Sequence, residues 1–285
     1  MTTETNELIV ATRKSPLALR QAEFAAESLR ERLGVAVEIA PMSTTGDQRL
    51  DWSLEKRGGK GLFTKELELA VLEERADLAV HSAKDLPTEM PAGLVLAGFL
   101  RREDPCDVLV IREEVESPRV IATGSPRRRA QLRERFPDAE WIEFRGNVET
   151  RLLRIAELRE ADATVLAAAG LKRLAIESFP GLRLESLPLD QNVPAAGQAA
   201  IALQCRVGEI DRFAVVCDDA TGRAVSLERE VLAAMGGGCH VAMGVHLRGD
   251  ELLIHHEDHG HHVVEVRDLS LSEALEKAMN HLETS

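Results

Sequence analysis

Residues 8–16 read Leu-Ile-Val-Ala-Thr-Arg-Lys-Ser-Pro, and residues 120–126 read Val-Ile-Ala-Thr-Gly-Ser-Pro. Each stretch has the form of a short buried strand, a turn and a Ser-Pro pair. Serine is a favourable N-cap and proline a favourable first helical residue, so a helix is expected after each pair. Residues 35–42 alternate as a second strand would, which makes the first stretch the start of a β-α-β unit with a parallel sheet. The repeat predicts two similar α/β lobes that face each other.

The length and composition indicate how many domains to expect. The chain has 285 residues, more than one typical domain, and 44% of them are apolar, enough for more than one core. Residues 101–105 are expected to cross between the lobes, and residues 187–198, which contain proline and glycine, to return. We predict three domains: residues 1–101 with 198–218 for the first lobe, 105–194 for the second, and 221–285 for a small α+β unit.

The charge of the chain bears on its partners. The formal net charge is −13, whereas proteins that bind a nucleic-acid backbone are usually basic. Aromatic residues make up only 3% of the chain, which leaves few side chains for stacking on single-stranded bases. We therefore predict no nucleic-acid partner, and we expect any basic cluster to bind a small anion.

The N-terminal segment and the cysteines bear on location. Residues 2–7 are polar and acidic, and the apolar run after them is too short for a signal peptide. No apolar stretch approaches the length of a membrane span, so we predict no membrane partner. The cysteines, at positions 106, 205, 217 and 239, include no CxxC pair, which disfavours a zinc ribbon or a thioredoxin-like motif. We expect a soluble cytoplasmic protein with reduced thiols.

Cys239 lies in the stretch Met235–Gly244, directly after three glycines that end an amphipathic helix over Val225–Met235. Glycine adopts positive φ and lets other groups approach the backbone closely. A cysteine at such a corner is accessible, and its thiolate is a soft nucleophile. The alternative is a helix C-cap followed by a small buried cysteine.

Asp85 follows a predicted strand over Asp77–Val80, within the run His81–Pro87. Ligands of open α/β sheets bind at the carboxyl ends of strands, so this run is a candidate site. Upstream, residues 44–61 form a polar loop with Gly-Gly-Lys-Gly before a helix. That loop either binds an anion at the helix N-terminus or is a flexible surface loop, and it is not a P-loop because glycine follows the lysine.

Arginines gather where strands meet helices or in the first turns of helices, at positions Arg13, Arg127, Arg128, Arg145, Arg151 and Arg173. Arginine binds carboxylates in a bidentate manner, and helix N-termini attract anions. In an acidic protein this placement indicates a cleft for a polycarboxylate. The alternative, a solvated helix face, fits Arg129, Arg133 and Arg135.

A histidine tract comprises His255, His256, His259, His261 and His262. Some of its spacings resemble those of metal ligands, but residues 257–260 read as a hairpin turn between alternating strands. No cysteine lies near the tract, so we predict no metal site there.

The motifs together resemble one family, porphobilinogen deaminase, also called hydroxymethylbilane synthase. The matching stretches, in chain order, are ATRKSPLALRQA, GGKGLFTKELE, ADLAVHSAKDLP, REDPCDVLV, ATGSPRRRAQL, RGNVETRL, AAGLKRL, PAAGQAAIALQCR and GGGCHVAMG. The resemblance implies two doubly wound α/β lobes like those of type II periplasmic binding proteins and a small α+β C-terminal domain. It also implies a monomer that condenses four porphobilinogens into hydroxymethylbilane, with loss of ammonia, in tetrapyrrole biosynthesis.

The resemblance implies a role for individual residues. A dipyrromethane cofactor is expected on Cys239 through a thioether, and Asp85 is expected to contact pyrrole nitrogens and handle protons. The other expected cofactor contacts are Arg13, Ser15, Lys84, Ser125, Arg127, Arg128, Arg145, Gly146 and Asn147. The expected substrate contacts are Arg13, Arg145, Arg151, Arg173 and Gln198, and a mobile loop is expected to carry Lys56 and Lys60.

Some positions depart from the family's usual residues. The family often has leucine, glycine, glutamine and proline where this chain has Pro126, Ala199, His240 and Ala242, which bears on loop stiffness and hinge motion. Two other functional classes fit the sequence less well. A non-catalytic solute-binding protein usually carries an export signal and needs no Cys239, and a nucleic-acid module is opposed by the net charge of −13.

Overall fold

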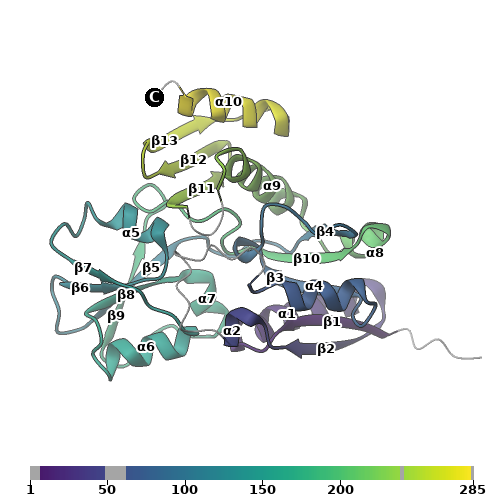
Figure 1. Ribbon diagram of the computed structural model, residues 1–285, viewed down its shortest axis with the longest axis horizontal. Helices are drawn as coiled ribbons and strands as arrows, with labels where there is room; N and C mark the ends of the chain where they lie inside the picture. The colour runs from purple at the N-terminus through teal and green to yellow at the C-terminus, as the bar shows by residue number, and fades with distance from the viewer. Residues whose placement is uncertain (1–6, 49–61, 238–240, 284–285) are drawn as a thin grey trace, which may run out of the picture. The chain divides into compact units, whose positions relative to one another are not determined.

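The computed structural model describes residues 7–48, 62–237 and 241–283 (Figure 1). The chain forms two compact units. The first contains the described parts of residues 1–49, 60–102 and 200–222, and the second those of residues 50–59, 103–199 and 223–285. The chain therefore leaves the first unit near residue 102 and returns to it near residue 200. The bounds of three separate domains stay a prediction.

The first unit is built on a five-stranded sheet in the order β2-β1-β3-β10-β4, in which β10 runs antiparallel to both of its neighbours. Its strands are β1 (Glu7–Arg13), β2 (Ala36–Met42), β3 (Leu78–Ser82), β4 (Leu94–Phe99) and β10 (Ile201–Arg206). Its helices are α1 (Pro16–Leu33), α2 (Thr45–Gln48), α4 (Lys65–Leu72), η1 (Ala83–Asp85), η2 (Val207–Glu209) and α8 (Ile210–Ala214).

Helix α1 begins and ends at the residues that the sequence indicates. The Ser15 hydroxyl accepts a hydrogen bond from the Ala18 amide at 3.3 Å, and Pro16 opens the helix. Gly34, with φ +66°, ends it. Helix α1 packs with Leu8 and Val10 on one face of the sheet, while α4 packs with alternate β1 residues on the other. The first lobe is therefore doubly wound, as predicted.

The second unit repeats this arrangement. Its five-stranded sheet has the order β7-β6-β8-β5-β9, with β5 antiparallel to both neighbours. The strands are β5 (Asp107–Arg112), β6 (Val120–Ala122), β7 (Glu140–Ile142), β8 (Ala163–Ala167) and β9 (Leu182–Leu187), and the helices are α5 (Pro126–Leu132), α6 (Val148–Ala156) and α7 (Ala168–Arg173). Leu132 of α5 packs on one face of the sheet, and α6 and α7 pack on the other.

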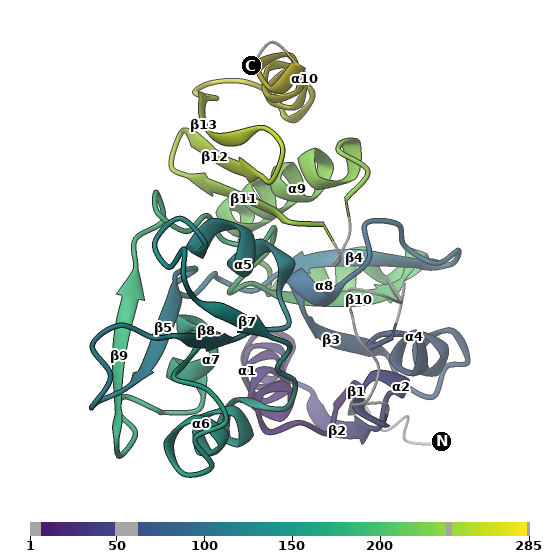
Figure 2. The same cartoon turned by 60° about the vertical axis from the view of Figure 1, so that its left-hand side comes forward.

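The C-terminal part of the second unit holds a separate antiparallel sheet (Figure 2). Its elements are α9 (Asp219–Ala234), β11 (Met243–Arg248), β12 (Glu251–His256), β13 (Gly260–Glu265) and α10 (Leu271–Glu283). Val231 of α9, Ile254 of β12 and Ala278 of α10 share its core. These elements confirm the predicted class: two doubly wound α/β lobes plus a small α+β part.

A buried carboxylate ties this part to the return segment of the chain. Glu228 on α9 accepts hydrogen bonds from the Gly197 amide at 2.7 Å and the Leu247 amide at 2.9 Å, and His246 Nδ1 lies 3.1 Å from it. Helix α9 is followed by Gly236 at φ +66°, so the predicted glycine stop is confirmed. Within the described residues, no helix has both the length and the apolar character needed to cross a membrane.

Candidate functional site

The first unit brings Asp85 and Arg13 together. Arg13 is the last residue of β1, and Asp85 lies in the η1 turn directly after β3, the parallel neighbour of β1. The Arg13 Nη1 atom is 4.0 Å from Asp85 Oδ2, and the two side chains are 23% and 36% exposed. Both groups remain open to a ligand from solvent. The structure thus brings two of the predicted site residues to neighbouring strand ends.

Arg13 has two further neighbours that the sequence analysis did not find. Its guanidinium forms an ion pair with Asp47 and lies 4.3 Å from the centre of the Phe63 ring. Burial alone would raise the pKa of Asp47, but hydrogen bonds from Arg13 and Thr44 outweigh burial and lower it. Asp47 sits in a polar run and Phe63 next to an apolar one, so neither carries a local signal of a site.

Behind Asp85 lies a buried histidine. His81 on β3 is 5% exposed, and its Nε2 atom is 3.0 Å from Oε1 of Gln204 on β10. Burial lowers the pKa of His81 to about 4, because a charged imidazole would lose its hydration there and would also meet the Arg13 charge. His81 is therefore neutral at physiological pH and adds no charge beside Asp85.

The other predicted residues of this unit occupy the same edge of the sheet. The Ser15 hydroxyl caps α1 by accepting the hydrogen bond from the Ala18 amide. Lys84 lies half-buried in the η1 turn beside Asp85. Next to them, Gln21 of α1 and Ser82 exchange side-chain hydrogen bonds at 3.0 and 3.1 Å. A small pocket is lined by Arg13, Gln21, Phe63, His81, Ser82 and Asp85.

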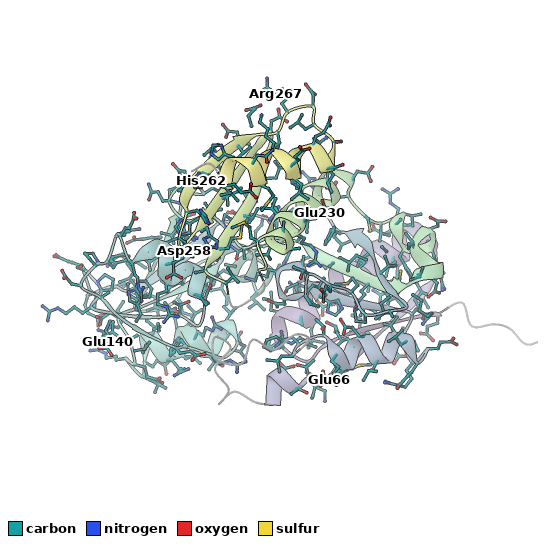
Figure 3. All side chains as sticks on the ribbon, turned by 45° about the horizontal axis from the view of Figure 1, so that its top comes forward. Glu66, Glu140, Glu230, Asp258, His262 and Arg267 are labelled. Atoms are coloured by element: carbon teal, nitrogen blue, oxygen red, sulfur yellow. The ribbon has the colours of Figure 1, made fainter. Side chains whose placement is uncertain are left out.

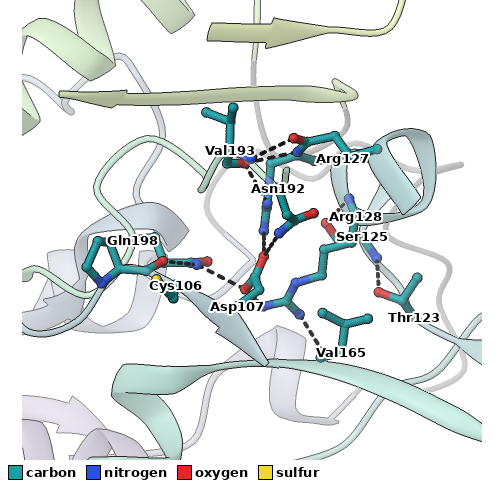
Figure 4. Close-up of polar contacts among 12 residues, drawn as sticks. Cys106, Asp107, Thr123, Ser125, Arg127, Arg128, Val165, Asn192, Val193 and Gln198 are labelled. Carbon is teal, nitrogen blue, oxygen red and sulfur yellow. Dashed lines mark hydrogen bonds and ion pairs between the residues drawn. The ribbon is translucent and has the colours of Figure 1, made fainter. Parts of the chain in front are cut away.

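In the second unit, Arg127 and Arg128 meet a buried carboxylate, Asp107 (Figure 4). The Arg127 Nη2 atom is 2.7 Å from Asp107 Oδ2, and the Arg128 Nη2 atom is 2.6 Å from Oδ1. Gln198 Nε2 donates to Oδ1 at 3.0 Å, and Asn192 Nδ2 donates to Oδ2 at 2.7 Å. Arg127 and Arg128 are 4% and 6% exposed, so they are far more buried than a solvated helix face would leave them.

The other predicted residues of this unit lie in or just before α6, which follows β7, and at the end of α7, which follows β8. Asn147 caps α6 through a hydrogen bond from the Thr150 amide at 2.7 Å, and Gly146, at φ +125°, accepts one from Arg151 Nε at 2.9 Å. Arg145 is half-buried beside them. Arg173 donates to the Ala199 carbonyl at 2.6 Å, and burial lowers its pKa to about 10 against the opposing effect of Glu103.

The arginine pair has unused donor capacity that an anion fits. Arg128 Nε is buried and has no hydrogen-bond partner among the described residues. A guanidinium carries five N–H donors, and a buried donor left unpaired is costly. The formal charge of Arg127, Arg128 and Asp107 together is +1. A carboxylate-bearing group such as a dipyrromethane fits this donor set.

Several predicted residues lie outside the described part of the chain. These are Cys239, Lys56, Lys60 and His240. The remaining cysteines differ from a reactive thiol: burial raises the pKa values of Cys106, Cys205 and Cys217 to about 11. A thiol with such a pKa carries little thiolate at neutral pH.

The histidine tract forms the β12–β13 hairpin, whose residues Asp258 and His262 are labelled in Figure 3. His255 is opposite His261 in the register, and the rings of His256 and His259 lie 5.0 Å apart. Across the ranges that the structure describes, no group of three or more His, Cys, Asp or Glu side chains is arranged to hold a metal ion.

Comparison with known proteins gives a family match. The family model "Porphobilinogen deaminase, dipyromethane cofactor binding domain" matches residues 8–212. The chain is 44% identical over 257 residues to porphobilinogen deaminase of Burkholderia thailandensis, covering 86% of this chain and 77% of that protein. It is 46% identical over 251 residues to the chloroplastic porphobilinogen deaminase of Euglena gracilis, covering 81% of this chain and 51% of that protein. The match thus spans about half the length of the Euglena protein.

A solved structure with a similar trace is the periplasmic VFT2 domain of Bordetella pertussis BvgS. It is 18% identical, covers 75% of this chain and 86% of its own, and has a TM-score of 0.43. A likeness of this size supports no conclusion about function.

The pKa of His81 predicts a pH dependence of stability. The unfolded chain takes up a proton at His81 as the pH falls through about 6.5, whereas the folded chain does so only near 4. The contribution of His81 to the free energy of unfolding is therefore complete above pH 6.5 and falls as the pH drops toward 4. Between pH 7.5 and pH 5 it should fall by about 2 kcal/mol, measured by urea unfolding of wild type against His81→Gln. The exposed His259→Gln variant is the control and should keep the wild-type pH dependence; a His81→Gln variant that also keeps it contradicts the assignment.

Proposed function

Because the chain belongs to the porphobilinogen deaminase family, we propose that it joins four porphobilinogen molecules head to tail into hydroxymethylbilane, releasing one ammonia at each step. The observation that carries the proposal is the placement of Asp85 beside Arg13 at the ends of two adjacent strands. Such an arrangement offers one carboxylate for a cation and one guanidinium for a substrate carboxylate. The product would enter tetrapyrrole biosynthesis.

The reaction requires a group that transfers protons and a negative charge that stabilises a cationic carbon. The amino group of porphobilinogen takes up a proton and leaves as ammonia, so its methylene carbon becomes cationic. That carbon bonds to the free α-carbon of the pyrrole at the end of the growing chain, which then loses its proton. After the fourth addition, one water molecule supplies the hydroxyl group of the released hydroxymethylbilane. Asp85 can accept hydrogen bonds from pyrrole N–H groups, offset the positive charge and move the proton. Its 36% exposure gives a substrate access to it.

Most of the proposed cofactor contacts lie in the second unit. When bound, a dipyrromethane supplies the primer to which substrate units are added. We propose that a thioether joins it to Cys239 and that its acetate and propionate groups are bound by arginines. Arg127 and Arg128 lie in the first turn of α5 beside the Ser125 cap, and Arg145, Gly146 and Asn147 lie at the start of α6. Arg13, Ser15, Lys84 and Asp85 are further proposed contacts.

Substrate carboxylates would be bound by further arginines. The proposed residues are Arg13, Arg145, Arg151, Arg173 and Gln198. Gln198 donates a hydrogen bond to Asp107, and Arg173 donates one to the carbonyl of the next residue, Ala199. Lys56 and Lys60 are proposed to lie on a loop that covers the ligand. We further propose that the protein acts as a cytoplasmic monomer with reduced thiols, and that it needs no nucleic-acid, membrane or metal partner.

The cofactor assignment predicts a covalent modification. Purified wild-type protein should be heavier than its sequence by one dipyrromethane unit, measured as intact mass. Cys239→Ser should have the bare sequence mass and no activity, because it lacks the thiol that forms the thioether. The matched variants Cys106→Ser, Cys205→Ser and Cys217→Ser should keep the added mass. Wild-type protein that is active at its bare sequence mass would refute the assignment.

The role of Asp85 predicts a large loss of turnover. Asp85→Asn keeps the shape of the side chain but removes its charge, so folding should survive while turnover falls at least about a hundredfold. Asp85→Glu should retain part of the activity, since it keeps a carboxylate. Single-turnover rates of cofactor-loaded variants are the measurement. An Asp85→Asn rate within about tenfold of wild type would be too small a loss for acid–base catalysis.

A further inference from the structure

We propose that Asp107 is a positioning residue for cofactor binding: its carboxylate fixes Arg127 and Arg128 in the one arrangement in which both guanidinium groups bind the carboxylates of the cofactor. The inference rests on the proposed function, because it takes these two arginines as cofactor contacts. Asp107 itself would not touch the cofactor. It was not among the residues that the sequence analysis singled out.

The Asp107 carboxylate binds two arginines, one at each of its oxygens. Asp107 is the first residue of β5 and is fully buried. Each of its oxygens accepts a hydrogen bond from one arginine, Oδ2 from Arg127 at 2.7 Å and Oδ1 from Arg128 at 2.6 Å. Charge-assisted hydrogen bonds of this length are strong and directional. One carboxylate therefore sets the positions of both guanidinium groups.

A second contact fixes the rotation of each guanidinium. Arg127 Nη1 donates to the Val193 carbonyl at 2.8 Å, and Arg128 Nη1 donates to the Val165 carbonyl at 2.8 Å. With two Nη atoms bonded, each planar group has a defined orientation. The remaining N–H groups then point in fixed directions, and the buried Arg128 Nε is a donor without a hydrogen-bond partner in the described part of the chain.

The charges explain why positioning matters here. Burial lowers the pKa of Arg127, and the neighbouring Arg128 charge adds to that effect, while Asp107 opposes it. Asp107 thus holds two like charges side by side in a buried place, and one positive charge remains for an anion. Arginine side chains lose much rotamer freedom when they bind a ligand, and prior fixing removes that cost from the binding step.

The amide donors give Asp107 a defined orientation. Asn192 and Gln198 each donate one hydrogen bond to it, and Gln198 also donates to the Pro105 carbonyl at 2.7 Å. Both donors come from the return end of the segment 103–199, and the bond to Pro105 ties Gln198 to the start of that segment, so Gln198 itself is held in place. A carboxylate whose own position is fixed can fix the arginines that bind it.

The test compares Asp107→Asn and Asp107→Glu with a control carboxylate in the same unit. Asp162 is the control, because it pairs with Arg112 and accepts hydrogen bonds from the Arg119 and Val120 amides, but lies outside the proposed site. Apo-protein of each variant is incubated with porphobilinogen, and the rate of cofactor loading is followed by intact mass. The half-saturating porphobilinogen concentration is compared with the maximal loading rate, alongside the melting temperature.

Positioning predicts a specific pattern. Asp107→Glu keeps the charge and the fold but displaces both arginines. Its half-saturating concentration should therefore rise about tenfold to a hundredfold, as metal affinity falls when a group that orients a metal ligand is removed. Asp107→Asn should load still more poorly at temperatures where it is folded. Asp162→Asn should load like wild type despite a lower melting temperature. If Asp107→Glu loads with the half-saturating concentration of wild type, the proposal is overturned. A negative charge at residue 107 would then be enough for cofactor loading, whatever the exact position of the carboxylate.

A second readout separates this proposal from the proposed function. The Nε–Hε signals of Arg127 and Arg128, assigned through Arg127→Lys and Arg128→Lys, should be resolved and sharp in wild-type apo-protein by NMR. They should shift in Asp107→Glu and, in folded Asp107→Asn, collapse to the position of exposed arginines. If wild-type protein never loads the cofactor, the proposed function is refuted. The NMR measurement on apo-protein would still test whether Asp107 positions the two arginines. Signals that stay unchanged in both variants would overturn the positioning role.

Discussion

A buried carboxylate that accepts hydrogen bonds from two buried arginines is the interaction on which the second unit depends. Removing Asp107 from water is costly, and hydrogen bonds to both of its oxygens are needed to offset that cost. Asp107 achieves this with Arg127, Arg128, Asn192 and Gln198, which come from α5 and from the return segment of the chain. The same contacts therefore hold the fold of this unit and set the donors that an anionic ligand would meet.

The first unit uses its own pairing of opposite charges for a similar purpose. Arg13 is held by Asp47 and the Phe63 ring, and Asp85 lies next to it at the end of the neighbouring strand. Both units thus place charged side chains at the carboxyl ends of their strands, where open α/β sheets bind ligands. The repeated fold accounts for the repeated placement, since in each unit a Ser-Pro helix start follows the first parallel strand.

The sequence predicted those features of the fold and site that local patterns encode. The repeated strand, turn and Ser-Pro predicted both lobes, and Asp85 and Arg13 were identified because each ends a strand. Asp107 and Asp47 were missed because their partners are far away in the sequence. The partners of Asp107 are 20 to 91 positions away, and Arg13, the partner of Asp47, is 34 positions away. Arg127 and Arg128 were expected to face a cleft, and their depth of burial was not foreseen. Ala199 shows the opposite case: its φ of +70° lies where glycine is favoured, at a position where the family often has glycine.

The central claim is that the buried arginine pair was built to bind a covalently anchored dipyrromethane. A crystal structure of the protein as purified tests it most directly. It should show electron density continuous from Cys239 Sγ through two pyrrole rings, with a ring carboxylate bonded to Arg127 or Arg128 while Asp107 keeps both guanidinium groups. A free Cys239 thiol, or a dipyrromethane whose carboxylates meet neither arginine, would contradict the claim.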